Sequence, residues 1–163
     1  GKEVIMQYIG AGDMVAAIAS LKDWDYPLTA ESVEDTRVTG WDKAGIMNII
    51  EGHPKIAINL LNIVLTRIDG IQQRYLELST ERVEQRIART LLRMMRSAGL
   101  KTPEGILIDI SLSRQNIADY SGTTLFTVSR TLSAWNKKGW IKSGREKITI
   151  TDSHSLVLFS ENA

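Results

Sequence analysis

Residues 112–150, LSRQNIADYSGTTLFTVSRTLSAWNKKGWIKSGREKITI, are the stretch that decides the fold. Ser113 is a hydroxyl residue at the position that caps a short helix, which we predict over residues 114–120. The pair Ser121-Gly122 then ends this helix, because glycine adopts the backbone conformations that a sharp turn requires. The stretch therefore opens with a short helix and a turn.

A second, longer helix is predicted directly after the turn. Thr123 and Thr124 offer another hydroxyl cap, and residues 125–138 carry apolar side chains with helical spacing at Val128, Leu132 and Trp135. Gly139 is the glycine expected just past the end of a helix. Two helices joined by a short turn that contains glycine form a helix-turn-helix unit, in which the second helix enters a DNA groove.

The remaining residues of the stretch predict a β-hairpin. Residues 140–142 and 147–151 flank the polar segment Ser143-Gly144-Arg145-Glu146, and Ile148 and Ile150 alternate as in a half-buried strand. A helix-turn-helix followed by such a hairpin, with a polar and basic tip, is a winged helix.

The positive charge of the chain is concentrated in this same stretch. Residues 113–150 hold seven basic and two acidic side chains, a net charge of +5, whereas residues 1–50 hold four basic and eight acidic ones, a net charge of −4. The net charge of the whole chain, +1, hides this asymmetry. Because a DNA-binding surface must neutralise phosphates, the basic stretch favours DNA as the partner.

Residues 113–132, SRQNIADYSGTTLFTVSRTL, resemble the DNA-binding domain of the CRP/FNR family of bacterial transcription regulators. The cap, the glycine, the second cap, the arginine and the wing follow one another in the family's order. Residues 1–14, GKEVIMQYIGAGDM, are similar to the later strands of the family's cyclic-nucleotide-binding-like β-roll, and the long segment between resembles its dimerisation helix. The resemblance covers nearly the whole chain. It implies an α+β fold and a cytoplasmic homodimer that binds double-stranded DNA, with RNA polymerase as a further partner.

The resemblance divides the chain into a sensor β-roll over residues 1–53, a dimerisation helix over 54–79 and a winged helix-turn-helix domain over 80–163. Because the family's β-roll has several strands before this point, we expect the sensor part to be truncated at its N-terminus. The patterns within it favour strands at 4–9, 29–33 and 36–41, followed by a short helix capped by Asp42.

The segment 54–78 carries a heptad pattern of apolar residues. Their spacing alternates between four and three over Ala57, Leu61, Val64, Ile68, Ile71, Tyr75 and Leu78. Such an a/d seam is typical of a helix that packs against the same helix of a second chain. The alternative is that the seam packs inside one monomer.

A further helix is predicted over residues 81–97, with Val83, Ile87, Leu91 and Met94 facing inward. Its five arginines, Arg82, Arg86, Arg89, Arg93 and Arg96, are interpreted as a solvated face. Residues 100–104 are expected to form a loop, residues 106–110 a strand, and Asp152 to cap a last short helix.

Arg130 is the residue expected to read bases, because a guanidinium can donate two hydrogen bonds to O6 and N7 of guanine. The resemblance places it at the family's reading arginine. A phosphate contact or an internal ion pair with Asp119 are the alternatives. The full set of expected DNA-binding residues is Ser113, Arg114, Gln115, Thr124, Phe126, Thr127, Ser129, Arg130, Arg145 and Lys147. Ser113, Gln115, Thr124, Thr127 and the wing cations are expected to contact phosphates, and Ser129 is expected to approach bases or backbone. Ordinary capping is the alternative for the capping hydroxyls, and solvation is the alternative for the wing cations.

The chain departs from the family at two places that decide ligand choice. Leu125-Phe126 stands where the family commonly has Arg-Glu, so the cytosine contact of that glutamate is lost, and Phe126 is suited to a thymine methyl instead. Ala17, Tyr26-Pro27 and Ile71-Gln72 stand where members that bind cyclic AMP carry charged and hydroxyl groups, which a buried cyclic phosphate needs.

The effector is therefore expected not to be cyclic AMP, and its identity and any cofactor are unknown. A pocket lined by Trp24, Tyr26, Trp41 and Tyr75 is one hypothesis, and a core or interface role for these aromatics is the alternative.

Composition excludes several classes of protein. The chain has 163 residues, of which 43% are hydrophobic and 24% charged, and no cysteine, so disulfides and cysteine-bound metal clusters are excluded. The two histidines are isolated, neither metal-ligand spacing nor a nucleophile–base pair is visible, and an enzyme is not expected. A winged-helix module that docks a protein through Leu125 and Phe126 is the alternative function.

Overall fold

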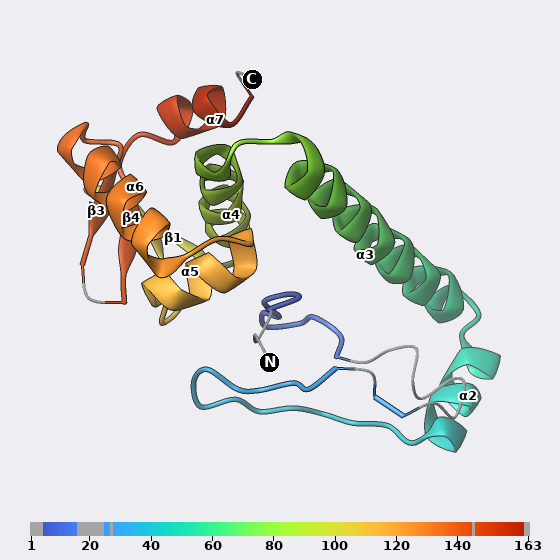
Figure 1. Ribbon diagram of the computed structural model, residues 1–163. Helices are drawn as coiled ribbons and strands as arrows, with labels where there is room; N and C mark the ends of the chain where they lie inside the picture. The colour runs from blue at the N-terminus through green and yellow to red at the C-terminus, as the bar shows by residue number, and fades with distance from the viewer. Residues whose placement is uncertain (1–4, 16–24, 27, 145, 162–163) are drawn as a thin grey trace. The chain divides into compact units, whose positions relative to one another are not determined.

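The computed structural model describes residues 5–15, 25–26, 28–144 and 146–161 (Figure 1). The chain divides into two compact units, one formed by Ala11–Tyr75 and the other by Gly1–Gly10 together with Leu76–Ala163. Within the described residues, no helix is both long enough and apolar enough to cross a membrane.

The C-terminal unit is a winged helix that confirms the α+β class. Its elements in chain order are α4 (Val83–Ala98), β1 (Gly99–Thr102), β2 (Gly105–Ile108), α5 (Arg114–Ser121), α6 (Leu125–Lys137), β3 (Ile141–Ser143), β4 (Ile148–Ile150) and α7 (Ser153–Glu161). The strands form one antiparallel sheet in the order β1-β2-β4-β3. The two helices, the turn and the wing predicted from residues 112–150 are all present (Figure 1).

One strand of this sheet contradicts the sequence prediction. Residues 100–104, expected to be a loop, include most of β1, which pairs with β2 from Gly99↔Ile108 to Thr102↔Gly105. A strand this short carries no apolar alternation that a sequence pattern can detect, and its stability comes from the pairing itself. Gly105 permits the tight turn, because its φ of 141° is unfavourable for other residues and a Cβ there would lie 2.2 Å from the Ile150 carbonyl oxygen.

The hydrophobic core of this unit lies between the helices and the sheet. The predicted inward residues Ile87, Leu91 and Met94 of α4 are buried. So are Val128, Leu132 and Trp135 of α6, and Ile148 and Ile150 of the wing. Burying each such side chain contributes about 1.5–3 kcal/mol to stability. The core therefore fixes which face of α6 points inward and leaves the opposite face in solvent.

The arginine row of α4 is not a solvated face, and that interpretation was wrong for three of its members. Arg86, Arg89 and Arg93 are half-buried and hold other elements. Arg89 donates to Glu81 Oε1 at 2.7 Å and to the Ser160 carbonyl at 3.0 Å, so it joins the start of α4 to α7. A residue's helical phase alone does not show which chain segments will pack over it, so the sequence pattern could not reveal these contacts.

Asp152 begins α7 as predicted. Its Oδ1 accepts from the Ser155 N–H at 2.9 Å and its Oδ2 accepts from the Ser155 hydroxyl at 2.6 Å. These hydrogen bonds, the side-chain one first, lower the pKa of Asp152 below its usual value. The charged carboxylate is therefore the form that stabilises the fold.

We expect Asp152→Asn to destabilise the protein at neutral pH, with a difference from wild type that disappears in acid. A carboxyl whose pKa is lowered on folding contributes stability above its unfolded pKa of about 3.9, and this contribution is lost as the pH falls through the lower folded value. Urea unfolding of both proteins between pH 2 and pH 7 measures the difference. Glu161→Gln, an exposed acid at the end of the same helix, is the control, and a constant difference across this range would contradict the assignment.

The other unit contains α2 (Lys43–Gly52) and most of α3 (Lys55–Thr80). Asp42 caps α2 as predicted, because its Oδ1 accepts from the Gly45 N–H at 2.7 Å. The strands expected before α2 are a different case: within the described residues 5–15, 25–26 and 28–42, no strand forms. A strand forms only where two segments pair in register along their backbones, and apolar alternation in the sequence does not by itself supply that pairing.

Candidate nucleic-acid interface

The first helix of the interface, α5, is fixed at its start by Ser113. The Ser113 hydroxyl accepts from the Asn116 N–H at 3.0 Å, and the Asn116 side chain accepts from the Ser113 N–H at 3.0 Å. This reciprocal capping confirms the predicted start of the helix. Arg114 and Gln115 follow as exposed residues, and the Gln115 amide donates to Asp119 Oδ1 at 2.7 Å. Among the described residues, Asp119 therefore accepts from Gln115, whereas the acidic neighbour of Arg130 is Glu84.

The turn between α5 and α6 is held by Gly122 and Arg86. Gly122 has a φ of 65°, in the left-handed region, and a Cβ there would meet Leu78 Cδ2 at 2.7 Å. The Arg86 guanidinium donates to the carbonyls of Ser121 at 3.0 Å, Gly122 at 3.1 Å and Glu81 at 3.0 Å. One side chain of α4 therefore ties the turn to the start of its own helix, which sets where α6 begins.

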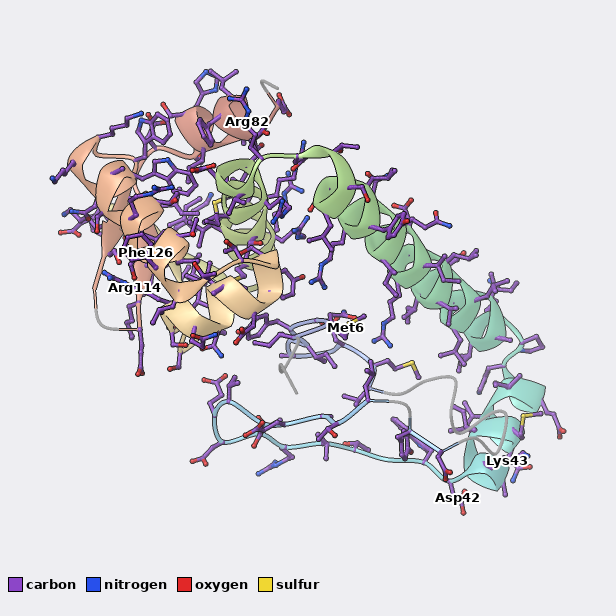
Figure 2. All side chains as sticks on the ribbon, viewed as in Figure 1. Met6, Asp42, Lys43, Arg82, Arg114 and Phe126 are labelled. Carbon is purple, nitrogen blue, oxygen red and sulfur yellow. The ribbon has the colours of Figure 1, made fainter. Side chains whose placement is uncertain are left out.

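The start of α6 is capped by Thr124 and presents apolar residues to solvent. Thr124 Oγ1 accepts from the Thr127 N–H at 3.2 Å and lies 3.0 Å from Thr127 Oγ1. In the same turn, Leu125 is 48% exposed and Phe126 is 75% exposed. Figure 2 labels Phe126 on α6 and Arg114 at the start of α5. The first turn of α6 therefore carries a pair of hydroxyl groups, from Thr124 and Thr127, and the solvent-exposed aromatic ring of Phe126, which a binding partner can contact.

Arg130 points out of the protein, one turn further along α6. Its side chain is 65% exposed, and one terminal nitrogen, Nη2, lies 3.5 Å from Glu84 Oε1 of α4. Ser129 beside it is half-buried. The guanidinium is therefore accessible to a ligand and has a carboxylate as its neighbour.

The wing is anchored to the segment before α5 through Glu146. The Glu146 carbonyl accepts from the Leu112 N–H at 3.0 Å, and its Oε2 accepts from the Ser111 hydroxyl at 3.0 Å. Glu146 has a φ of 57°, which is uncommon for a residue with a side chain. Lys147 is exposed beside it, whereas Arg145 lies outside the described residues. This anchor holds the basic wing next to α5.

A groove of about 600 Å³ lies between these elements. It is bordered by the first turn of α5, by Leu125 and Leu132 of α6 and by the wing residues Ser143, Gly144 and Glu146. Around it, Lys142 pairs with Glu104 at 2.8 Å, and Lys138 lies over the Trp140 ring at 4.6 Å. In the described part of the chain, Arg114, Lys137 and Lys147 make no ion pair. These cations keep their charge available for phosphates.

The apolar seam of α3 is mostly in solvent. Leu61 is 56% exposed, Ile68 46%, Ile71 54% and Tyr75 71%; Ala57 is also exposed and Val64 half-buried. Leu78, 51% exposed, belongs to the C-terminal unit and lies near Gly122. The seam is thus a continuous apolar stripe that a single chain leaves largely uncovered.

The structure does not gather the aromatic residues suggested for an effector pocket. Tyr26 is 66%, Trp41 55% and Tyr75 71% exposed, and Trp24 lies outside the described residues, as do Ala17 and Pro27. The pocket therefore stays a prediction. Among the described side chains, no group of three or more metal-ligating residues comes together.

Three residues with clear roles at this interface were not singled out from the sequence. Arg86 holds the turn, Glu84 lies beside Arg130 and Glu146 anchors the wing. Each contacts a segment 34 to 46 residues away in the chain, so no local pattern marks it. The half-buried position of Arg86 is visible only in the structure, so the sequence pattern offered no signal for it.

The chain is similar in sequence to known transcription regulators. Residues 85–158 match the family model described as the Crp-like helix-turn-helix domain. The chain is 22% identical over 156 residues to the CRP-like cAMP-activated global transcriptional regulator of Mycobacterium tuberculosis, covering 96% of this chain and 70% of that protein. It is 34% identical over 104 residues to the transcriptional activator protein FnrL of Cereibacter sphaeroides, covering 61% of this chain and 42% of that one.

A solved structure has the same fold. A mutant of CooA from Carboxydothermus hydrogenoformans superposes with a TM-score of 0.65 at 26% identity, covering 74% of this chain and 56% of that one. The chain thus spans little more than half the length of this structural relative.

Proposed function

Because this chain belongs to the CRP/FNR family of bacterial transcription regulators, we propose that it binds a pseudo-palindromic DNA site as a homodimer, under the control of an effector other than cyclic AMP. We further propose the division into a sensor part over 1–53, a dimerisation helix over 54–79 and a DNA-binding domain over 80–163. Its place of action would be the bacterial cytoplasm, and RNA polymerase would be its partner at a promoter.

The observation that carries this proposal is the outer face of α6. It presents the Thr124 and Thr127 hydroxyls, the exposed Phe126 ring and the exposed Arg130 guanidinium beside an anchored basic wing. Hydroxyls and helix N-termini bind phosphates, whereas guanidinium and apolar groups distinguish base edges. One helix face therefore offers both kinds of contact that sequence-specific DNA binding requires.

The homodimer rests on the exposed seam of α3. The helix has 26 residues, and its heptad stripe is exposed to solvent. A second copy of the same helix would bury this stripe best, because its own stripe has the same length and spacing. A two-fold dimer brings two α6 helices to successive major grooves only if the half-sites lie about one helical turn, roughly 34 Å, apart. This geometry is why we expect a pseudo-palindrome.

We expect Ile68→Asp to shift the protein from dimer to monomer, because two carboxylates would face each other at the centre of the apolar seam. Ile58→Asp is the matched control, since Ile58 is 60% exposed on the same helix but lies off the seam. Sedimentation velocity of both variants measures the change. A dimer that tolerates Ile68→Asp as well as Ile58→Asp would contradict the seam as the interface.

The test of the proposed function is selection of bound sites from random duplex DNA by the wild-type protein. We expect an enriched motif with two inverted half-sites about one helical turn apart. Affinity for it should fall steeply with salt, since several phosphates are neutralised. Enrichment of no sequence, or of a site without inverted symmetry, would contradict the proposal.

The same selection measures the role of Phe126. We expect Phe126→Glu to change the preferred base pair at one position of each half-site toward cytosine, by about tenfold in relative affinity, because glutamate accepts a hydrogen bond from cytosine N4 whereas phenylalanine packs against a thymine methyl. Phe126→Leu keeps the apolar contact and is the control. An unchanged motif with Phe126→Glu would mean that this side chain does not reach the bases.

A second function, docking of a protein, is favoured by the exposure of Leu125 and Phe126. Large apolar side chains bare to solvent at a helix start are also found at protein interfaces. The net charge of +5 over residues 113–150 disfavours this reading. A protein partner that stays bound in high salt and in excess DNA would support it.

A further inference from the structure

Glu84 is the acidic neighbour of the proposed reading arginine, although it lies outside the helix-turn-helix. It belongs to the first turn of α4, which packs against α6, and its Oε1 lies 3.5 Å from Nη2 of Arg130. Both helices belong to the C-terminal unit (Figure 1). Nothing in the family resemblance assigns this carboxylate a part in DNA binding.

We propose that Glu84 is a positioning residue that orients the Arg130 guanidinium toward guanine and so sets the base preference at that position. The inference rests on the proposed function, since it needs Arg130 to meet DNA. A guanidinium has five N–H donors in one plane, so contact of Nη2 with a carboxylate leaves enough donors for O6 and N7 of guanine. When the carboxylate of Glu84 holds one edge of the Arg130 guanidinium, the opposite edge can face the bases in fewer orientations.

The helix that carries Glu84 is tied to the turn before α6. Arg86, two residues further on, donates to the carbonyls of Ser121 and Gly122 in the turn that precedes α6. The start of α4 and the start of α6 are therefore tied to the same turn.

The contact is suited to orientation and not to stability. Its two side chains are 65% and 38% exposed, and ion pairs this open to solvent contribute little to folding. For the same reason the pair does not hold Arg130 away from DNA, since guanine can take up the remaining donors. The negative charge should nevertheless repel nearby phosphates, which act on every DNA sequence alike.

These two effects of the carboxylate have opposite signs, and this makes the inference testable. We expect Glu84→Gln to lower the preference for guanine at the position read by Arg130 by about threefold to tenfold, a part of the discrimination that a bidentate contact supplies. Affinity for unrelated duplex DNA should rise by a few-fold, because one negative charge per subunit is removed. A residue with only a structural role would move both affinities together.

The experiment compares equilibrium binding of the full chain to two duplexes, the selected site and the same site with that guanine replaced. The position is the one at which preference is lost when selection is repeated with Arg130→Ala. Glu104→Gln is the matched control, because it removes a carboxylate from an exposed ion pair, with Lys142, that lies on other elements. In the Arg130→Lys background, which lacks the planar guanidinium, Glu84→Gln should cause no further loss of preference.

Two results would overturn the inference. One is a preference in Glu84→Gln equal to that of Glu104→Gln, and the other is tighter binding to both duplexes with an unchanged ratio, which would make Glu84 a competitor of DNA. If the wild-type protein itself distinguishes no sequences, the proposed function fails instead. A protein that selects its site and depends on Arg130 but ignores Glu84 sinks this inference alone.

Discussion

Replacing Arg130 with alanine is expected to cost about 2 to 6 kcal/mol of specific binding free energy per dimer, a loss of affinity of roughly thirtyfold or more. A bidentate contact to guanine contributes about 1–3 kcal/mol of discrimination, and a dimer makes it twice. The side chain is 65% exposed on α6 and its ion pair with Glu84 is open to solvent, so its removal should leave the fold intact. Titration of the selected duplex measures the loss.

The comparison with unrelated DNA separates base reading from phosphate binding. Arg130→Ala should weaken binding to a scrambled duplex far less than to the selected site. Lys147→Ala is the control, because Lys147 is exposed on the wing and should weaken binding to all sequences alike while it lowers the salt slope. An Arg130→Ala variant that loses equal affinity on both duplexes would make Arg130 a phosphate contact.

The helix-turn-helix and the wing could be predicted because their signals are local. Ser113 and Thr124 each cap a helix by accepting a hydrogen bond from the backbone N–H three residues further on. The turn between the helices needs a left-handed backbone conformation, and the residue there is Gly122. Trp135 is buried, as its helical phase required. The physical cause of each feature lies inside the segment that shows it, so the sequence alone contains the needed information.

The contacts that position this unit could not be predicted because their causes lie far apart in the chain. Arg86 meets the carbonyls of Ser121 and Gly122, 35 and 36 residues away. Arg93 meets Glu77 across 16 residues. A row of arginines on one helix face looks solvated until the tertiary structure brings acceptors to it. The prediction of strands before α2 was wrong for a related reason. Alternation of apolar and polar residues leads to a strand only where a second strand pairs with it.

Arg93 is the cation whose loss should destabilise the protein most. Its Nη1 donates to both carboxylate oxygens of Glu77, at 2.8 and 2.9 Å, and its guanidinium carbon lies 5.7 Å from the centre of the Tyr120 ring. Glu77 sits in the last turns of α3 and is only 9% exposed. This pair therefore joins the end of the proposed dimerisation helix to α4 and, through Tyr120, to α5.

We expect Arg93→Met to lower the free energy of unfolding by about 2 to 3 kcal/mol, because it leaves the buried Glu77 carboxylate without its main partner. Breaking a fully buried ion pair costs about 3–5 kcal/mol. The loss here should be smaller, because the Arg93 side chain is 30% exposed and Arg89 Nε lies 4.0 Å from Glu77 Oε1, where it partly compensates the carboxylate. Urea unfolding of the isolated variants measures the change. Arg96→Met, an exposed arginine of the same helix, is the control and should change little.

The double variant Glu77→Gln with Arg93→Met decides whether the unpaired charge is the cause. A neutral amide in place of the carboxylate should recover most of the lost stability, because the cost of Arg93→Met comes from burying a charge and not from lost packing. If the double variant is as unstable as Arg93→Met, the aromatic contact with Tyr120 carries the effect. In that case Arg93 stabilises the fold through its contact with the Tyr120 ring of α5, and not through the ion pair with Glu77.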